Sequence, residues 1–191
     1  GGGTGTTGGG TGTTGGGTAC VPVVTELLIN GNLDNGPGAE WLEYSSKGYE
    51  VVVAASGSVA AHSGTYVGLL GGDYNENDEL YQTITVPAGT TQLVISGYYL
   101  IVTDENATST IAYDHGSLDV YDTIAAGGGL IESELSLSNV DHVSTWTHFS
   151  QTVSVNLSGE SVDLTMSSDN DNSQKTWFFF DSLSVKATHC P

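Results

Sequence analysis

The sequence predicts an all-β sandwich preceded by a low-complexity segment. From about Val21 onward, apolar side chains recur with a period of two rather than 3.6, which is typical of strands with one buried face. Gly, Asn, Asp and a Pro-Ala-Gly triplet interrupt these runs at short intervals, as turns between strands do. No segment of ten residues has a convincing helical period. Many short strands separated by turns indicate a sandwich or a barrel, and we favour the sandwich.

The strands are placed by this alternation. It is clearest in three runs, each of which puts one set of side chains on a single strand face: Leu80, Gln82, Ile84 and Val86; Val162, Leu164 and Met166; and Trp177, Phe179, Asp181, Leu183 and Val185. The full set of predicted strands covers residues 23–29, 50–54, 66–70, 79–86, 91–103, 117–124, 130–137, 146–157, 161–167 and 175–187.

Residues 1–19 form a separate Gly/Thr-rich segment, and residues 20–191 form the sandwich domain. The first 18 residues repeat GGGTGTT with a period of seven, a composition that cannot build an apolar core. The repeat contains G-x-G-x-x-G by chance, because no strand precedes it and no helix follows it, as a phosphate-binding loop requires. The segment is either a flexible low-complexity linker or an ordered extended tail through which residues 1–18 contact other copies.

The two cysteines, Cys20 and Cys190, stand at the two ends of the β region. We expect a single disulfide that joins the first strand to the last, the alternative being two unrelated thiols. A structural disulfide implies an oxidising compartment, so the chain is predicted to be extracellular or on a cell surface.

The charge balance excludes several classes of partner. The chain carries 22 acidic residues, three lysines and no arginine, for a net charge of −19. Nucleic-acid affinity depends on basic side chains that displace counterions, so nucleic acid is not an expected partner. No apolar run approaches 18 residues, so we expect no membrane insertion. An acidic surface of this kind attracts cations.

Sequence motifs for catalysis are lacking. Neither G-x-S-x-G nor H-E-x-x-H occurs, and His142 and His148 are too far apart along a strand to act as a pair. The sequence therefore predicts a protein that is not an enzyme.

An acidic stretch places oxygen-bearing side chains at Asp73, Asn75, Asn77 and Asp78. Calcium takes six to eight oxygen ligands from such groups. The stretch is not an EF-hand, because Asp78 occupies the position of the invariant glycine and Ile84 that of the bidentate glutamate. It is either a calcium-binding loop or a solvated acidic turn.

Asp181 is a second candidate metal ligand. It alternates with apolar residues and should point toward the interior, where a carboxylate is costly unless it is paired or binds a metal. With so few basic residues, a cation is the simplest partner, and Asp34 could supply a second carboxylate. The alternative is a carboxylate capped by backbone amides.

The order of several short motifs resembles that of galactose-binding-like jelly rolls. The resemblance covers about residues 26–186, and its motifs are LINGNLD (28–34) followed by Trp41, HSGTYVGLLG (62–71), NDELYQTITVPAG (77–89), Tyr113-Asp114, Trp146 and FFDSLSV (179–185). The resemblance implies a jelly-roll sandwich that serves as a non-catalytic, carbohydrate-binding accessory module of secreted bacterial hydrolases, often with a structural calcium ion.

In that family the opening acid and the closing aspartate commonly bind the ion, which here implies Asp34 and Asp181. The chain departs from the pattern at Asp34, where Glu is usual, and at Ser182, where a second Asp often stands. The tryptophans fall at positions that resemble core positions of the family, so the candidate sugar platforms are the tyrosines, namely Tyr44, Tyr74, Tyr98, Tyr99 and Tyr121.

The expected partner is thus a glycan or another cell-surface polymer. The alternative function is a structural subunit of a surface or filamentous assembly, whose Gly/Thr arm contacts neighbouring copies.

Overall fold

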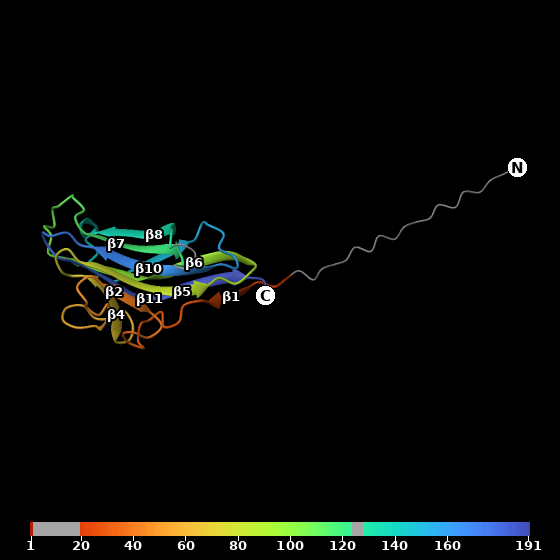
Figure 1. The fold of residues 1–191 in the computed structure, drawn as a ribbon, viewed down its shortest axis with the longest axis horizontal. Helices are drawn as coiled ribbons and strands as arrows, with labels where there is room; N and C mark the ends of the chain where they lie inside the picture. Colours follow the sequence, from red (N-terminus) through yellow and green to blue (C-terminus); the bar gives the residue numbers. More distant parts are fainter. Residues whose placement is uncertain (2–19, 124–127) are drawn as a thin grey trace.

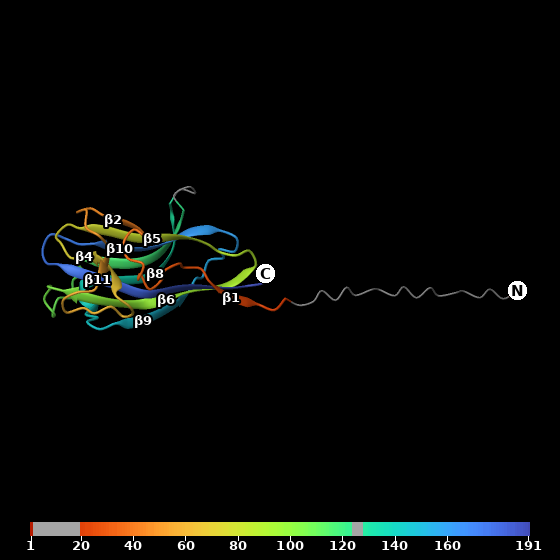
Figure 2. The same ribbon diagram turned by 90° about the horizontal axis from the view of Figure 1, so that it is seen from below.

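Two antiparallel β-sheets pack face to face. The structure is a computed structural model, which describes residues 1, 20–123 and 128–191. Figures 1 and 2 show the two layers from perpendicular directions, with β1 and the C-terminus at one end of the sandwich. The predicted linker or arm (2–19) lies outside the described residues. No helix in the described part of the chain is long and apolar enough to cross a membrane.

The first layer, which we call the β11 sheet, has β11 at its centre. Its strand order is β3 (Val52–Ala54), β4 (Tyr66–Gly71), β11 (Thr176–His189), β6 (Thr90–Thr103) and β9 (Thr147–Thr152), and β1 (Val23–Glu26) also pairs with β11. The second layer, the β10 sheet, has the order β2 (Leu42–Ser45), β5 (Asn77–Thr85), β10 (Ser161–Asp169), β7 (His115–Asp122) and β8 (Leu130–Ser138). One 3-10 turn, Asn139–Asp141, follows β8.

The sequence-based prediction of an all-β sandwich is confirmed, and each of the ten predicted strands overlaps an observed one. Strand β2 was not predicted. It has only four residues, so the alternation of Leu42 and Tyr44 with polar residues is too short to identify a strand, and both of these side chains are exposed.

The main core lies between the sheets, where alternate residues of both layers meet. Its largest fully buried side chains include Trp41, Phe178 and Phe180. The indole Nε1 of Trp41 donates a hydrogen bond to the carbonyl of Asn30 at 2.9 Å, which satisfies the buried polar end of the ring.

A β-bulge at Ser182 interrupts strand β11, for which the sequence predicted a single shared face. The register between β11 and β6 shifts between Asp181 and Ser184, and Ser182 has a φ of 53°. Leu183 and Val185 therefore belong to the main core, whereas Phe179 belongs to a second cluster outside the sheet. The prediction of one shared face from residue 177 to residue 185 was wrong because a bulge exchanges the two faces of a strand.

The predicted disulfide is confirmed. Cys20 and Cys190 are bonded, with Cα atoms 5.9 Å apart, next to the β1–β11 ladder that pairs Val23 with His189. The bond ties the two ends of the sandwich domain together.

Candidate ligand-binding face

A second apolar cluster covers the outer face of the β11 sheet. Val67 of β4, Leu100 of β6 and Phe179 of β11 are buried there, on the side opposite to the main core. The partly buried side chains packed around them are Val53, Ala55, Val59, Ala61, Leu69, Val102, Trp146 and Trp177. This explains the unbroken apolar run of β11 from Trp177 to Phe180, since strands covered on both faces do not alternate.

Residues 54–59 leave a hollow of about 350 Å³ against this face. Its floor is apolar and includes Val67, Val102 and Phe179, and the partly exposed ring of Trp177 lines it as well. Exposed Ser56, Ser58 and Asp104 add two hydroxyls and a carboxylate. An apolar hollow with a few polar groups fits a ligand that has both an apolar face and hydrogen-bonding groups.

Aromatic rings extend the same face toward β9. His62 stacks on Tyr98 with ring centroids 3.6 Å apart, and His148 meets Tyr98 edge-on at 5.0 Å. Trp146 lies 6.0 Å from His62, and its Nε1 donates to the carbonyl of Ala60 at 2.9 Å. That bond holds the 55–61 segment over the sheet.

The tryptophans were expected in the core, and only Trp41 is in the main core. Trp146 and Trp177 are partly buried in the outer cluster. The sequence could not distinguish the two situations, because a strand residue under a covering loop shows the same apolar pattern as a core residue.

Of the tyrosines proposed as platforms, Tyr98 lies on this outer face, paired in register with Asp181 and His148. The other four lie elsewhere: Tyr99 packs against the main core, Tyr44 and Tyr121 belong to the β10 sheet, and Tyr74 lies under Lys175, whose Nζ is 5.0 Å from the ring centroid.

The carboxylate of Asp181 is fully buried on the outer face and is capped by backbone amides. Ser63 N donates to its Oδ2 at 2.9 Å, and Ser182 N donates to its Oδ1 at 2.5 Å. Burial nevertheless raises the pKa of this carboxyl above its usual range. Asp34 accepts from Thr65 N at 2.6 Å. The alternative of amide capping is therefore present in the structure, and calcium binding by Asp34 and Asp181 stays a prediction.

His62 and Ser182 form a contact that resembles part of a catalytic triad. His62 Nδ1 lies 2.9 Å from Ser182 Oγ. Asp181, however, accepts its hydrogen bonds from Ser63 and Ser182, whereas the acid of a Ser-His-Asp triad orients the imidazole. The arrangement fits a bonded turn better than an activated nucleophile.

The predicted calcium loop is divided by the start of β5. Asp73 forms an ion pair with Lys175, with Oδ1 and Nζ 3.2 Å apart, and exposed Asn77 donates to Asp169 Oδ1 at 2.8 Å. Asn75 is exposed, with its backbone N bonded to the carbonyl of Asp171. Asp78 alone points inward, where its Oδ2 accepts from Gly71 N at 2.7 Å. The four predicted ligands thus have different surroundings, and calcium binding by this loop stays a prediction.

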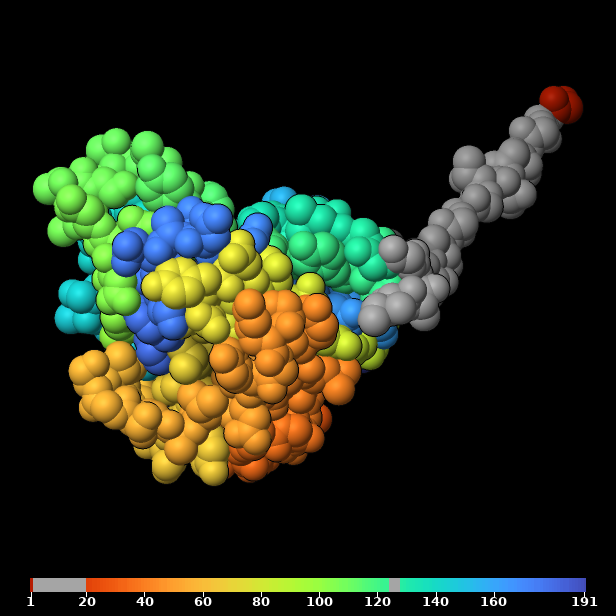
Figure 3. Space-filling view, turned by 60° about the vertical axis from the view of Figure 1, so that its left-hand side comes forward, coloured from red at the N-terminus to blue at the C-terminus, as the bar shows by residue number. Residues whose placement is uncertain are grey.

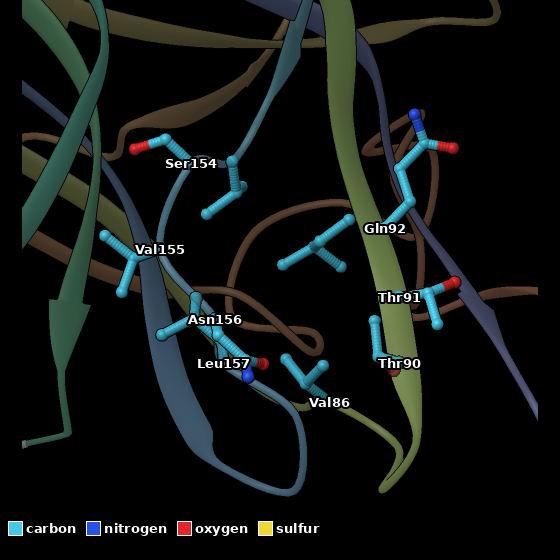
Figure 4. A pocket seen from close by; sticks show the side chains of 10 residues that line it. Val86, Thr90, Thr91, Gln92, Ser154, Val155, Asn156 and Leu157 are labelled. Atoms are coloured by element: carbon cyan, nitrogen blue, oxygen red, sulfur yellow. The ribbon is translucent and has the colours of Figure 1, made fainter.

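Two other hollows are less suited to a sugar. The one in Figure 4, about 390 Å³, lies between the start of β6 and residues 153–157, and its lining contains no aromatic ring. The other, about 230 Å³, lies on the outer face of the β10 sheet between Tyr81 and Tyr121. It also contains Glu79, Asp122 and Asp163, so it is strongly acidic.

Comparisons with known structures support the fold. No family model matches the sequence, and a search of characterised proteins finds no relative. The chain is similar to the carbohydrate-binding module TmCBM61 in complex with beta-1,4-galactotriose, with 20% identity and a TM-score of 0.59, covering 84% of this chain and 97% of that one. It is also similar to a family 16 carbohydrate-binding module, with 18% identity and a TM-score of 0.53 over 83% and 98% of the two chains.

A third similar structure is the K3 adhesin domain of Lys-gingipain from Porphyromonas gingivalis, with 13% identity and a TM-score of 0.56 over 86% and 99% of the two chains. The chain therefore shares the jelly-roll β-sandwich fold of these three domains. At these identities the likeness defines the fold and not the ligand.

Proposed function

We propose that this chain is a non-catalytic carbohydrate-binding module that uses the outer face of the β11 sheet, with Trp177 as its platform. The observation that carries the proposal is the hollow in which Trp177 lies beside Ser56, Ser58 and Asp104. The C–H faces of a sugar ring pack on an aromatic ring, and the sugar hydroxyls bond to polar groups at the edge.

The structural neighbours support the same class of ligand. One of them was determined with beta-1,4-galactotriose bound, which makes a β-1,4-galactan the first polysaccharide to test. The hollow on the outer face of the β11 sheet is favoured over the tyrosine-lined hollow of the β10 sheet, because the first hollow is larger and contains only one carboxylate. In a hollow with one carboxylate, a neutral sugar removes water from fewer charged groups than in a hollow with three, so the cost of binding is lower.

The experiment is a polysaccharide binding series that includes β-1,4-galactan, measured by affinity electrophoresis and calorimetry. Trp177→Ala should weaken binding by about tenfold or more, because an aromatic platform contributes about 1.5–3 kcal/mol when covered. Tyr121→Ala, on the opposite sheet, is the matched control and should bind like the wild type. Equal loss in both variants, or no binding by the wild type, would refute the proposed site.

Secretion and exposure on a cell surface belong to the same proposal, and a structural calcium ion is a proposal independent of the ligand. The disulfide between Cys20 and Cys190 supports an oxidising compartment.

The alternative, an assembly subunit, depends on residues 2–19, which lie outside the described part of the chain. It predicts concentration-dependent association that disappears when residues 1–18 are removed. Size-exclusion chromatography with light scattering would distinguish this behaviour from that of a monomeric module.

A further inference from the structure

At the end of the sandwich opposite to the disulfide, four side-chain oxygens are buried without a hydrogen-bond partner. They are Glu76 Oε2, Asp78 Oδ1, Ser168 Oγ and Asn170 Oδ1. The exposed fractions of these residues are 1%, 3%, 5% and 2%. Buried polar atoms almost always form hydrogen bonds, so four unpartnered side-chain oxygens in one place require an explanation.

The fold brings these oxygens together from two segments that are distant in sequence. Asp78 of β5 and Ser168 of β10 are in register across the β10 sheet, and both follow the inward-facing alternation of their strands. Glu76 precedes β5 and Asn170 follows β10, and Asn170 N donates to the carbonyl of Glu76 at 2.9 Å. Figure 3 shows the two segments side by side at this end of the molecule, the first in yellow and the second in blue.

Gly71 links Asp78 to Asn170. Its N–H donates to Asp78 Oδ2 at 2.7 Å, and a Cβ built on it would lie 2.7 Å from Asn170 Oδ1. The amide nitrogen of Asn170 is already used, since Nδ2 donates to the carbonyl of Thr176 at 2.8 Å. The side-chain oxygen of Asn170 is thus turned toward the Gly71–Asp78 side and left free.

The two carboxylates receive little compensation from the protein. Ser45 Oγ lies 3.4 Å from Glu76 Oε1, which is a weak bond. The other oxygen of Glu76 and Oδ1 of Asp78 have no hydrogen-bond partner. The one cationic side chain lining the adjoining cavity, Lys175, is already paired with Asp73. Two carboxylates buried in this way are costly unless a cation joins them.

We propose that Glu76, Asp78 and Asn170, together with the hydroxyl of Ser168, form a calcium site. All four donors are oxygens and two are carboxylates, which is the ligand set of a hard cation. This set shares only Asp78 with the loop predicted from sequence and includes neither Asp34 nor Asp181. It does not depend on the proposed carbohydrate binding.

A cavity of about 300 Å³ connects the site to the surface. Glu76 and Asp78 line it, together with Glu50 and Asp73, so its mouth is acidic and attracts cations. Trp177 lines this cavity as well as the candidate ligand hollow. The ion would therefore stabilise the 71–78 segment beside the proposed platform.

The test measures the melting temperature of the intact chain in EDTA and in calcium chloride. Calcium should raise the wild-type melting temperature by about 5 °C or more at 100 times its dissociation constant. Glu76→Gln and Asp78→Asn should each abolish this increment. In EDTA the Glu76→Gln protein should melt at or above the wild-type temperature, because one of two repelling buried charges is gone.

Matched controls locate the ion. Glu79→Gln removes the exposed carboxylate that directly follows Asp78 but lies on the outer face of the β10 sheet, and Asp34→Asn removes the ligand predicted from the family resemblance. Both should keep the calcium increment. Loss of the increment in Asp34→Asn with retention in Glu76→Gln would overturn the proposal, as would a wild-type protein that does not respond to calcium.

Terbium luminescence provides a second measurement that does not depend on the stability of the variants. Excitation of Trp177, which lines the adjoining cavity, should sensitise bound terbium in the wild type, and calcium should displace it. The signal should fall in Trp177→Phe and disappear in Glu76→Gln. A terbium signal that is unchanged in Glu76→Gln would also overturn the proposal.

Discussion

Asp34 and Asp181 accept hydrogen bonds from the two ends of one tripeptide, although they are 147 positions apart in the sequence (181 minus 34). Thr65 N donates to Asp34 and Ser63 N donates to Asp181. The residue between them, Gly64, has a φ of +60°. The Ser63-Gly64-Thr65 tripeptide therefore joins the opening loop of the domain to its last strand.

Gly64→Ala should be strongly destabilising. An added Cβ would lie 1.7 Å from Asp34 Oδ2, and the backbone conformation disfavours any side chain. We expect a loss of about 3 kcal/mol or more in the free energy of unfolding, measured by denaturant titration.

Gly159→Ala is the control for Gly64→Ala. Gly159 also has a positive φ, of +86°, but nothing lies within 4 Å of the position that an added Cβ would take. It should lose only about 1–2 kcal/mol. Equal losses at the two glycines would mean that the contact with Asp34 is unimportant.

Reduction of the Cys20–Cys190 disulfide should lower the free energy of unfolding by about 2–5 kcal/mol. The bond closes a loop of 170 positions, and the main effect is the greater freedom of the unfolded chain. Urea titrations with and without reductant measure the difference. A Cys20→Ser/Cys190→Ser variant should show the lower stability in both conditions, and a variant that still responds to reductant would contradict this explanation.

Glu134 should make stability depend on pH. It lies in β8 opposite a register shift between Leu118 and Asp119, is 8% exposed, and has an unpartnered Oε1. Burial, with the charges of Glu132 and Asp119, raises its pKa from 4.5 to about 7. The folded state therefore holds this proton more tightly than the unfolded state does.

Since the folded-state pKa is the higher one, the cost of ionising Glu134 is absent below about pH 4.5, grows as the pH rises, and is complete above about pH 7. Glu134→Gln should be more stable than the wild type by about 3 kcal/mol above pH 7, and equal to it near pH 4.5. Thermal unfolding across this range measures the difference. Exposed Glu160→Gln is the control, and a pH-independent gain in Glu134→Gln would contradict the prediction.

Trp146→Phe should loosen the segment that covers the β11 sheet. The substitution keeps an aromatic ring but removes the bond from Nε1 to Ala60, at a cost of about 1 kcal/mol. Elastase, which prefers small residues, should cleave within 55–61 faster than in the wild type. Tyr44→Phe, on the other sheet, should leave the cleavage rate unchanged, and protection equal to the wild type in Trp146→Phe would show that other contacts hold the segment.

The strands and the two-layer class could be predicted because they follow from patterns of neighbouring residues. The disulfide could be predicted because few pairings of the cysteines are possible. Alternation along Leu80–Val86 needs only neighbouring residues, and two cysteines allow one pairing. The short β2 strand and the bulge at Ser182 could not be predicted, because neither changes the residue types in a way that periodicity detects.

The site was harder to predict than the fold. Asp181 was recognised as a buried carboxylate from its apolar neighbours, but the amides that cap it come from Ser63 and from the bulge. Glu76 lies within the predicted acidic stretch but was not among its predicted ligands, and Asn170 lies in an Asp/Asn-rich segment, 168–172, whose composition is weaker evidence for calcium and favours a hairpin turn. Each is a polar residue beside a turn, and they become unusual only when their burial is known.

The amino-acid sequence by itself determined that this chain forms an all-β sandwich whose ends are joined by a disulfide. The apolar period and the turn residues depend on near neighbours in the sequence, and two cysteines can form only one pair. Only the tertiary structure decided which face of the β11 sheet carries Trp177 in a hollow, and that oxygens from residues 76–78 and 168–170 meet. Both depend on register between strands and on a covering segment far away in sequence, and those are set by packing of the whole domain.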